Sequence, residues 1–241
     1  MKRFCLAISL ILASFSACTY YNCPSPKKPF SAVKKPAVIN DELVVYVYVR
    51  FTDSTSVVYG SGFVYGTDGL VVTAYHIVRH PNIKDVFVRF REDGKLIVKK
   101  VQWTESAPQN DTALLKIPHK FKTSAAIRLR VLDRAEPIYV LGFPLTGPDD
   151  VPLDAKPPVL LGNFFKYYKS KFRFVDTEMY LLDARLAPGN SGGPVFDRNG
   201  EVVGIATQTA TVKGALFACA VRAKHFAALY NRAALLHGLK K

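Results

Sequence analysis

The feature that most constrains the fold is a succession of short runs rich in β-branched and aromatic residues, which begins near residue 43. Turn-forming segments such as Thr67-Asp68-Gly69 separate these runs. Many short strands at this spacing are typical of an all-β barrel or sandwich. The expected strands are 43–49, 61–65, 70–73, 86–90, 96–103, 113–117 and 137–143, followed by 159–165, 173–176, 179–184, 193–196, 201–209 and 215–221.

The end of the chain has a helical pattern instead. Apolar residues from Phe226 to Leu236 recur at steps of three and four positions, which predicts a helix that packs on the body through one apolar face. We expect this helix over residues 222–238, with Gly238 as its C-cap.

The beginning of the chain is different in kind from the rest. Lys2 and Arg3 form a short basic head, and an apolar run follows over residues 4–15. This is the pattern of a secretory signal, and the apolar run is too short to span a membrane stably.

The end of this signal carries a second feature. Residues 15–18, Phe-Ser-Ala-Cys, resemble a bacterial lipobox, although Phe15 stands where Leu or Val is usual. The resemblance implies that residues 1–17 are a lipoprotein signal peptide and that Cys18 is lipidated, by palmitate among other chains, and becomes the mature N-terminus. The alternative is an ordinary signal peptide that is cut near Ala17.

The next segment, residues 18–41, contains four prolines and four lysines and little material for a core. It is predicted to be a semi-extended tether between a lipid anchor and a folded body. The formal net charge of the chain is +14 at pH 7, which favours anionic surfaces, and anionic lipid is the natural one for an exported protein. These features predict a lipoprotein anchored to a membrane of the bacterial cell envelope, facing the periplasm or the exterior. The alternative for the charge is a soluble surface of biased composition.

Cysteine usage agrees with this organisation. Beyond the signal and Cys18, only Cys23 in the tether and Cys219 in an apolar run remain. A disulfide framework is therefore not expected, and Cys219 is predicted to be a small core residue.

Three positions in this β-rich chain carry residue types that suit nucleophilic catalysis. His76 ends the run 71–76, Asp111 follows Asn110, and Ser191 lies within the segment Pro-Gly-Asn-Ser-Gly-Gly-Pro at 188–194. A serine hydroxyl needs a base within hydrogen-bond reach, and an imidazole can take its proton and return it later. A buried carboxylate holds the imidazole in the required tautomer. The chain order His, Asp, Ser is one in which this arrangement is known.

With their flanks, these segments resemble the trypsin-like serine peptidases, and within them the HtrA-like branch, over residues 58–221 or so. The resemblance implies a peptidase domain over 42–241, built from two antiparallel six-stranded β-barrels at about 42–135 and 136–221. The active site of this family lies in the cleft between the barrels. About 20 residues follow Val221, so the PDZ domain common in HtrA proteins is not expected here.

The same resemblance implies a function. The chain would be a serine endopeptidase that cleaves protein or peptide substrates through the triad His76, Asp111 and Ser191 and an acyl-enzyme intermediate. No metal and no organic cofactor are expected, because no segment offers clustered ligands at metal-site spacing. The alternative is a catalytically inactive binding protein on the same fold at the cell envelope.

The glycines around the serine have a predicted role as well. Gly189 lets the loop turn so that its own N–H and that of Ser191 converge as an oxyanion hole. Asn190 stands where the secreted digestive peptidases carry an Asp that pairs with a freshly cut N-terminus. An amide cannot form that ion pair, so activation by N-terminal cleavage is not expected.

Arg185 lies six residues before Ser191, at the place whose side chain often floors the substrate pocket in this fold. A buried cation there would favour an acidic residue before the cut. The alternative is that Arg185 faces solvent.

Two rival interpretations remain. The segment Gly-Asn-Ser-Gly-Gly at 189–193 also fits the Gly-x-Ser-x-Gly pattern of α/β-hydrolases, but Pro194 opposes the helix that this pattern requires. The segment 165–174 interleaves basic and aromatic residues, which could suit single-stranded nucleic acid. In a β protein it is more simply an exposed hairpin whose alternate residues face inward, so no nucleic-acid partner is expected.

Overall fold

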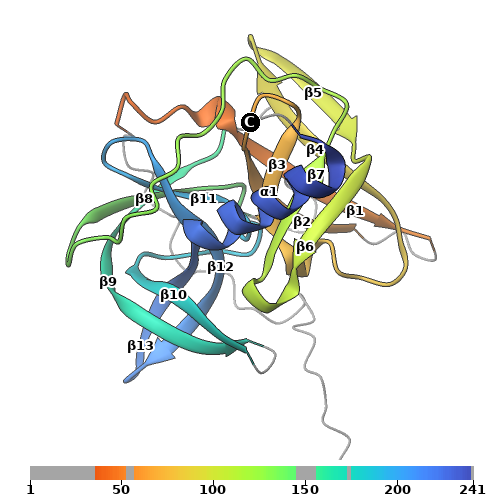
Figure 1. The fold of residues 1–241 in the computed structure, drawn as a ribbon. Helices are drawn as coiled ribbons and strands as arrows, with labels where there is room; N and C mark the ends of the chain where they lie inside the picture. The colour runs from red at the N-terminus through yellow and green to blue at the C-terminus, as the bar shows by residue number, and fades with distance from the viewer. Residues whose placement is uncertain (1–35, 53–56, 145–155, 173–174, 240–241) are drawn as a thin grey trace, which may run out of the picture.

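The computed structural model describes residues 36–52, 57–144, 156–172 and 175–239, with side chains of 170–176 left aside. Figure 1 shows two β lobes side by side with one helix lying across them. The predicted signal, Cys18 and most of the tether fall outside the described residues. Within the described part, no helix combines the length and the apolarity that crossing a bilayer requires.

The first lobe is a single antiparallel sheet with the strand order β5-β4-β1-β2-β3-β7-β6. The short 3-10 helices η1, η2 and η3 span Asp41–Leu43, Tyr75–Ile77 and Pro108–Asn110. The strands are β1 Val44–Phe51, β2 Val57–Val64, β3 Leu70–Ala74, β4 Ile83–Glu92, β5 Lys95–Lys100, β6 Trp103–Ala107 and β7 Thr112–Lys116.

This lobe differs from the expected six-stranded barrel in one respect. The predicted strand 96–103 is two strands, β5 and β6, which form the two edges of a seven-stranded sheet. The N–H of Val101 donates to Val86 on β4, whereas the next N–H, from Gln102, donates to Lys116 on β7. Because two consecutive residues reach opposite halves of the sheet, the sheet must curl until its edges nearly meet.

The second lobe is the six-stranded closed barrel that was predicted, with the order β10-β13-β12-β11-β8-β9. The predicted strands 173–176 and 179–184 were expected to be separate, but their residues 175–176 and 179–183 lie in one strand, β10. The strands are β8 Pro137–Leu141, β9 Val159–Phe172, β10 Val175–Asp183, β11 Pro194–Asp197, β12 Val202–Val212 and β13 Ala215–Arg222.

The basic and aromatic segment that begins at Phe165 lies in the β9–β10 hairpin, as predicted. Alternation along β9 holds up to Phe164, which is buried, but then fails because the register with β10 shifts between Leu181 and Leu182. Phe165 falls in this irregularity, is 42% exposed and stacks on Phe217 of β13 at 4.7 Å between ring centroids. The hairpin is therefore a β feature whose aromatic rings pack on their neighbours.

The helix α1, Ala223–His237, confirms the predicted C-terminal helix, and Gly238 caps it in the left-handed conformation. It contacts β6 and β7 of the first lobe and β12 and β13 of the second. Phe226 is 1% exposed and meets Phe63 edge-on at 5.5 Å. Leu236 was expected on the apolar face but is 64% exposed, because the residue of this turn that faces the body is His237, whose ring stacks on Trp103 of β6 at 4.1 Å.

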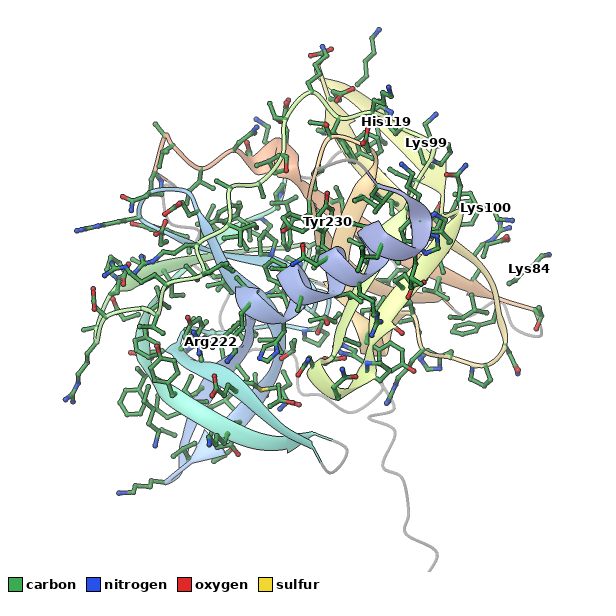
Figure 2. All side chains as sticks on the ribbon, in the orientation of Figure 1. Lys84, Lys99, Lys100, His119, Arg222 and Tyr230 are labelled. Atoms are coloured by element: carbon green, nitrogen blue, oxygen red, sulfur yellow. The ribbon has the colours of Figure 1, made fainter. Side chains whose placement is uncertain are left out.

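The side chains labelled in Figure 2 include two on or beside the helix and three lysines on the first lobe. Arg222 lies where β13 passes into α1, and Tyr230 lies farther along the helix (Figure 2). On the first lobe, Lys84, Lys99 and Lys100 lie at one side of the molecule (Figure 2), and Lys100 forms an ion pair with Asp85 at 2.5 Å.

Cys219 is fully buried, as expected, and burial raises the pKa of its thiol to about 11.

His225, in the first turn of α1, makes the stability of the fold depend on pH. Burial, with Lys224 and Arg222 nearby, lowers the pKa of His225 from 6.5 to about 4. Between these values the unfolded chain binds a proton that the folded chain does not, so stability falls as pH drops from about 6.5 towards about 4. We expect His225→Gln to flatten this part of a Tm-versus-pH curve. A variant whose Tm fell as steeply as that of the wild type over this window would contradict the assignment.

Candidate active site

His76 and Asp111 are brought together by the pairing of two strands. β3 and β7 are antiparallel neighbours, with Ala74 opposite Thr112 at the end of the ladder. His76 follows β3 within η2, and Asp111 precedes β7 directly after η3. Because the two residues continue from paired strand ends, their side chains face each other at the rim of the first lobe.

The Asp111 carboxylate holds His76 at two points. Its Oδ2 lies 2.8 Å from the His76 Nδ1, and its Oδ1 accepts the His76 backbone N–H at 2.9 Å. The backbone carbonyl of Asp111 accepts the N–H of Tyr75 at 3.1 Å. Asp111 is 2% exposed and has a φ of 49°, in the left-handed region that Asp tolerates better than most residues. The ring of His76 is therefore fixed in orientation by a buried, charged acceptor.

Ser191 lies in the loop between β10 and β11, and its backbone is tied to the first lobe. Its carbonyl accepts the N–H of Ser61 at 2.8 Å. The neighbouring Gly192 has a φ of 85°, and a Cβ there would lie 2.2 Å from the Ser61 carbonyl oxygen and 2.8 Å from the Ala74 N. Only a glycine allows this approach, which sets the serine beside the strand end that leads to His76.

The hydroxyl of Ser191 donates to the carbonyl of Thr207 on β12 at 3.1 Å. In the described part of the chain it has no hydrogen bond to His76. The structure thus joins two of the three predicted catalytic residues directly and places the third at the lobe junction. Catalytic hydrogen bonds are often long or absent in free enzymes and form when substrate binds, so this geometry is compatible with a triad.

Two backbone N–H groups are available where an oxyanion hole was predicted. Gly189 has a φ of 92° and is buried, and neither its N–H nor that of Ser191 donates to any residue that the structure describes. The carbonyl of Gly189 accepts the Ser61 hydroxyl at 2.7 Å. That hydroxyl in turn accepts the N–H of Phe143 at 2.9 Å.

Ser61 and Thr207 are site residues whose roles the sequence did not reveal. Ser61 sits in the Gly-Ser-Gly-Phe segment at 60–63, but its contact with Gly189 joins residues 128 positions apart. The only sequence signal was a small polar residue between two glycines on a strand. Its hydroxyl fixes the peptide group that precedes Asn190, and so helps to set the direction of the turn.

Asn190 is 1% exposed, and neither polar atom of its side-chain amide has a hydrogen-bond partner among the described residues. On the first lobe, burial lowers the pKa of His80, and the charges of Arg79 and His76 lower it further.

Arg185 was expected either to floor a substrate pocket or to face solvent. The residue is exposed in the segment between β10 and the serine loop, as the second interpretation has it. A role of Arg185 in a substrate pocket stays a prediction.

Comparison with known proteins agrees with this architecture. A family model described as the trypsin-like peptidase domain matches residues 60–205. A probable periplasmic serine endoprotease DegP-like of Pseudomonas putida strain W619 is 33% identical over 163 residues, 64% of this chain and 30% of that protein. Serine protease HTRA1 of Xenopus laevis is 30% identical over 212 residues, 86% of this chain and 43% of that protein. The solved structure of the HtrA-type protease AlgW with tripeptide has a TM-score of 0.64 at 22% identity, covering 82% of this chain and 62% of that one.

The chain therefore belongs to the trypsin-like peptidases, and it is similar to DegP-like and HTRA1 serine proteases. It spans less than half of the length of the DegP-like and HTRA1 relatives.

Proposed function

We propose that this chain is a serine endopeptidase in which Ser191 is the nucleophile, His76 the general base and Asp111 the residue that orients the base. The proposal rests on two contacts between Asp111 and His76. The carboxylate Oδ2 lies 2.8 Å from the ring Nδ1, and Oδ1 accepts the His76 backbone N–H at 2.9 Å. A buried carboxylate that contacts a histidine in this way holds the imidazole in the required tautomer and stabilises the imidazolium that forms during catalysis.

The tautomer follows from the contacts. Since the carboxylate of Asp111 can only accept, the Nδ1 of His76 carries the hydrogen, and Nε2 is left bare to accept a proton. When a peptide enters, the Ser191 hydroxyl turns from the Thr207 carbonyl to this nitrogen and attacks the scissile carbonyl carbon. The proton moves to His76, and the imidazolium that forms is stabilised by Asp111.

The remaining steps use the backbone. The oxyanion of the tetrahedral intermediate is held by the N–H groups of Gly189 and Ser191. His76 then gives its proton to the leaving amine, which departs and leaves an acyl group on Ser191. Water enters, His76 takes one of its protons, and the same tetrahedral chemistry releases the acid and restores the hydroxyl.

A peptidase assay tests this function. We expect the purified chain to hydrolyse casein or a fluorogenic peptide at a rate that EDTA leaves unchanged. The competing function, an inactive binding protein, is favoured by one observation, the bond of the Ser191 hydroxyl to Thr207 in place of His76. Peptide binding with no turnover under any of these conditions would support the binding protein.

We further propose that the protein is held in the bacterial cell envelope by lipid on Cys18. The signal and lipobox pattern at residues 1–18 supports this, and the DegP-like relative is named periplasmic. Stable anchoring usually takes two signals, and the lysines of the tether would add electrostatic attraction to the acyl chains. Peptides or proteins of the envelope are then the substrates, as AlgW was solved with a tripeptide.

Replacing Cys18 tests the anchor. We expect Cys18→Ser to remain unlipidated and to move from the detergent phase to the aqueous phase, because it lacks the thiol that receives lipid. Cys23→Ser, five residues farther along the tether, is the matched control and should partition like the wild type. Equal partition of wild type and Cys18→Ser into the aqueous phase would show that this cysteine anchors nothing.

A further inference from the structure

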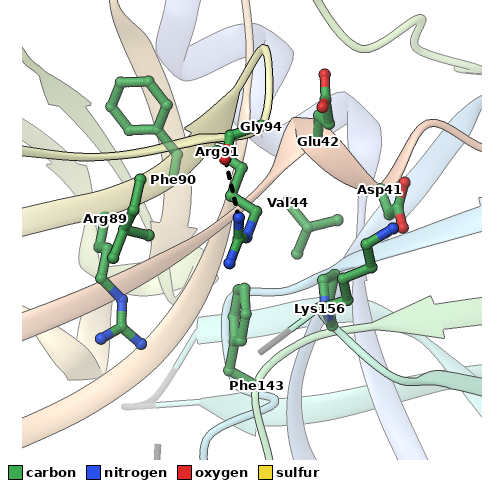
Figure 3. A pocket seen from close by; sticks show the side chains of 11 residues that line it. Asp41, Glu42, Val44, Arg89, Phe90, Arg91, Gly94, Phe143 and Lys156 are labelled. Atoms are coloured by element: carbon green, nitrogen blue, oxygen red, sulfur yellow. Dashed lines mark hydrogen bonds between the residues drawn. The ribbon is translucent and has the colours of Figure 1, made fainter. Parts of the chain in front are cut away.

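The first lobe carries a small pocket that the proposed chemistry does not use. It lies between β4, the β4–β5 turn, the η1 segment and the chain that follows β8 (Figure 3). Its volume is about 160 Å³, which suits one side chain or one terminal residue of a ligand. Arg89, Arg91 and Lys156 line it, with Phe143 and the acidic residues Asp41 and Glu42.

Arg89 is the unusual member of this set. It is 8% exposed, and no carboxylate in the described part of the chain pairs with it. Its guanidinium lies over the ring of Tyr46, its partner across the β1–β4 ladder, at 4.4 Å from the centroid. Burial lowers the pKa of Arg89, but an arginine keeps its proton in proteins. A buried cation without an anionic partner is costly, so this position favours an anion from outside the chain.

The other charges restrict the kind of anion. Figure 3 shows Arg89 at one end of the pocket and Asp41 and Glu42 at the other, with Phe143 below and between them. Arg91 donates a hydrogen bond to the Gly94 carbonyl at 3.1 Å, so it is partly engaged within the chain. The lining as a whole has three cations, Arg89, Arg91 and Lys156, and two carboxylates, so its net charge of about +1 suits a monoanion better than a dianion. A carboxylate has a single negative charge and can accept two parallel N–H bonds from a guanidinium.

Hydrogen bonds connect this pocket to the catalytic loop. The backbone N–H of Phe143 donates to the Ser61 hydroxyl, which donates to the Gly189 carbonyl. The ring of Phe143 packs edge-on against Tyr46 at 5.7 Å, and Tyr46 is opposite Ser61 in the β1–β2 ladder. The pocket is therefore joined to the catalytic loop through Phe143 and Ser61.

We propose that this pocket binds a carboxylate group of a peptide through the guanidinium of Arg89, either an acidic side chain or a C-terminal carboxylate. The inference rests on the proposed peptidase function for the nature of the ligand. Binding itself needs no turnover, so it is testable in Ser191→Ala.

The test is a thermal-shift titration of the full chain carrying Ser191→Ala, at constant ionic strength. The probes are N-acetyl-glutamic acid α-amide for a side-chain carboxylate, N-acetyl-alanine for a terminal carboxylate, N-acetyl-glutamine amide as the neutral control and inorganic phosphate. We expect a saturable rise in Tm with at least one carboxylate probe and none with the neutral one. Whichever carboxylate binds more tightly identifies the source of the group.

Matched variants assign the effect to Arg89. Arg89→Gln should weaken carboxylate binding about tenfold or more, because a charge-assisted pair is lost, and Arg89→Lys should bind with intermediate affinity. Arg130→Gln removes an exposed arginine and should bind like the parent. If Arg89→Gln fails to fold, Arg89→Lys and the probe comparison decide. No saturable shift, an equal shift in both Arg89 variants and the parent, or tighter binding of phosphate would overturn the proposal. Loss of peptidase activity alone would not affect this result.

Discussion

Replacing Ser191 with alanine is expected to lower kcat by a factor on the order of 10⁶ without unfolding the protein. Among the residues that the structure describes, the side chain makes one hydrogen bond, to the Thr207 carbonyl, so its loss costs little stability. The acyl-enzyme, however, cannot form without the hydroxyl. His76→Ala should cost about as much, because nucleophile and base act as one unit and their losses do not add. The measurement is kcat on a fluorogenic peptide, with Tm as the check on folding.

A serine outside the site provides the control for this prediction. Ser106→Ala on β6 makes the same chemical change away from the lobe junction and should keep the wild-type rate. Casein cleavage by purified Ser191→Ala at the wild-type rate would rule out the assigned nucleophile.

Asp111→Asn is expected to lower kcat by roughly 10⁴ while leaving the backbone in place. The amide oxygen can still accept the His76 backbone N–H, as Oδ1 does at 2.9 Å. The amide NH₂ then faces Nδ1, so this nitrogen becomes an acceptor and the hydrogen moves to Nε2. An imidazole in that tautomer cannot take the proton of Ser191. The rate on a short peptide, together with the Tm, measures the effect.

The control here is Asp133→Asn, which changes an exposed carboxylate paired with Arg130. It should leave kcat unchanged. If Asp111→Asn kept the wild-type kcat, the carboxylate would have no part in orienting His76.

Most strands and the helix could be predicted from the sequence because each depends on a local pattern, and the proposal for the three catalytic positions rests on local patterns too. Alternating β-branched runs and a glycine-rich serine segment are visible within ten residues. The exposure of Leu236 was not predictable, since steps of three and four from Ala233 lead to both Leu236 and His237, and only the stacking of His237 on Trp103 shows which of them faces the body. The split between β5 and β6 depends on Val101 and Gln102 bonding to strands on opposite sides of the sheet.

The missed parts of the site depend on long-range contacts. Ser61 has a role in the site because its hydroxyl donates to the Gly189 carbonyl. The exposure of Arg185 depends on the path of the segment before the serine loop. Arg89 is the clearest case. On a strand it is an ordinary charged residue on one face, and only the packing of Tyr46 and the pocket around Phe143 bury it. Such residues are defined by neighbours that lie tens of positions away.

The central claim is that Ser191 is an activated nucleophile, and covalent labelling with a fluorophosphonate probe tests it most directly. Intact mass and peptide mapping should find one adduct on the wild-type chain, on Ser191. Ser191→Ala should not label, and His76→Ala should label far more slowly, because its hydroxyl lacks a base. A folded wild-type chain that does not label at this residue, or labelling of Ser191→Ala to the same extent, would contradict the account.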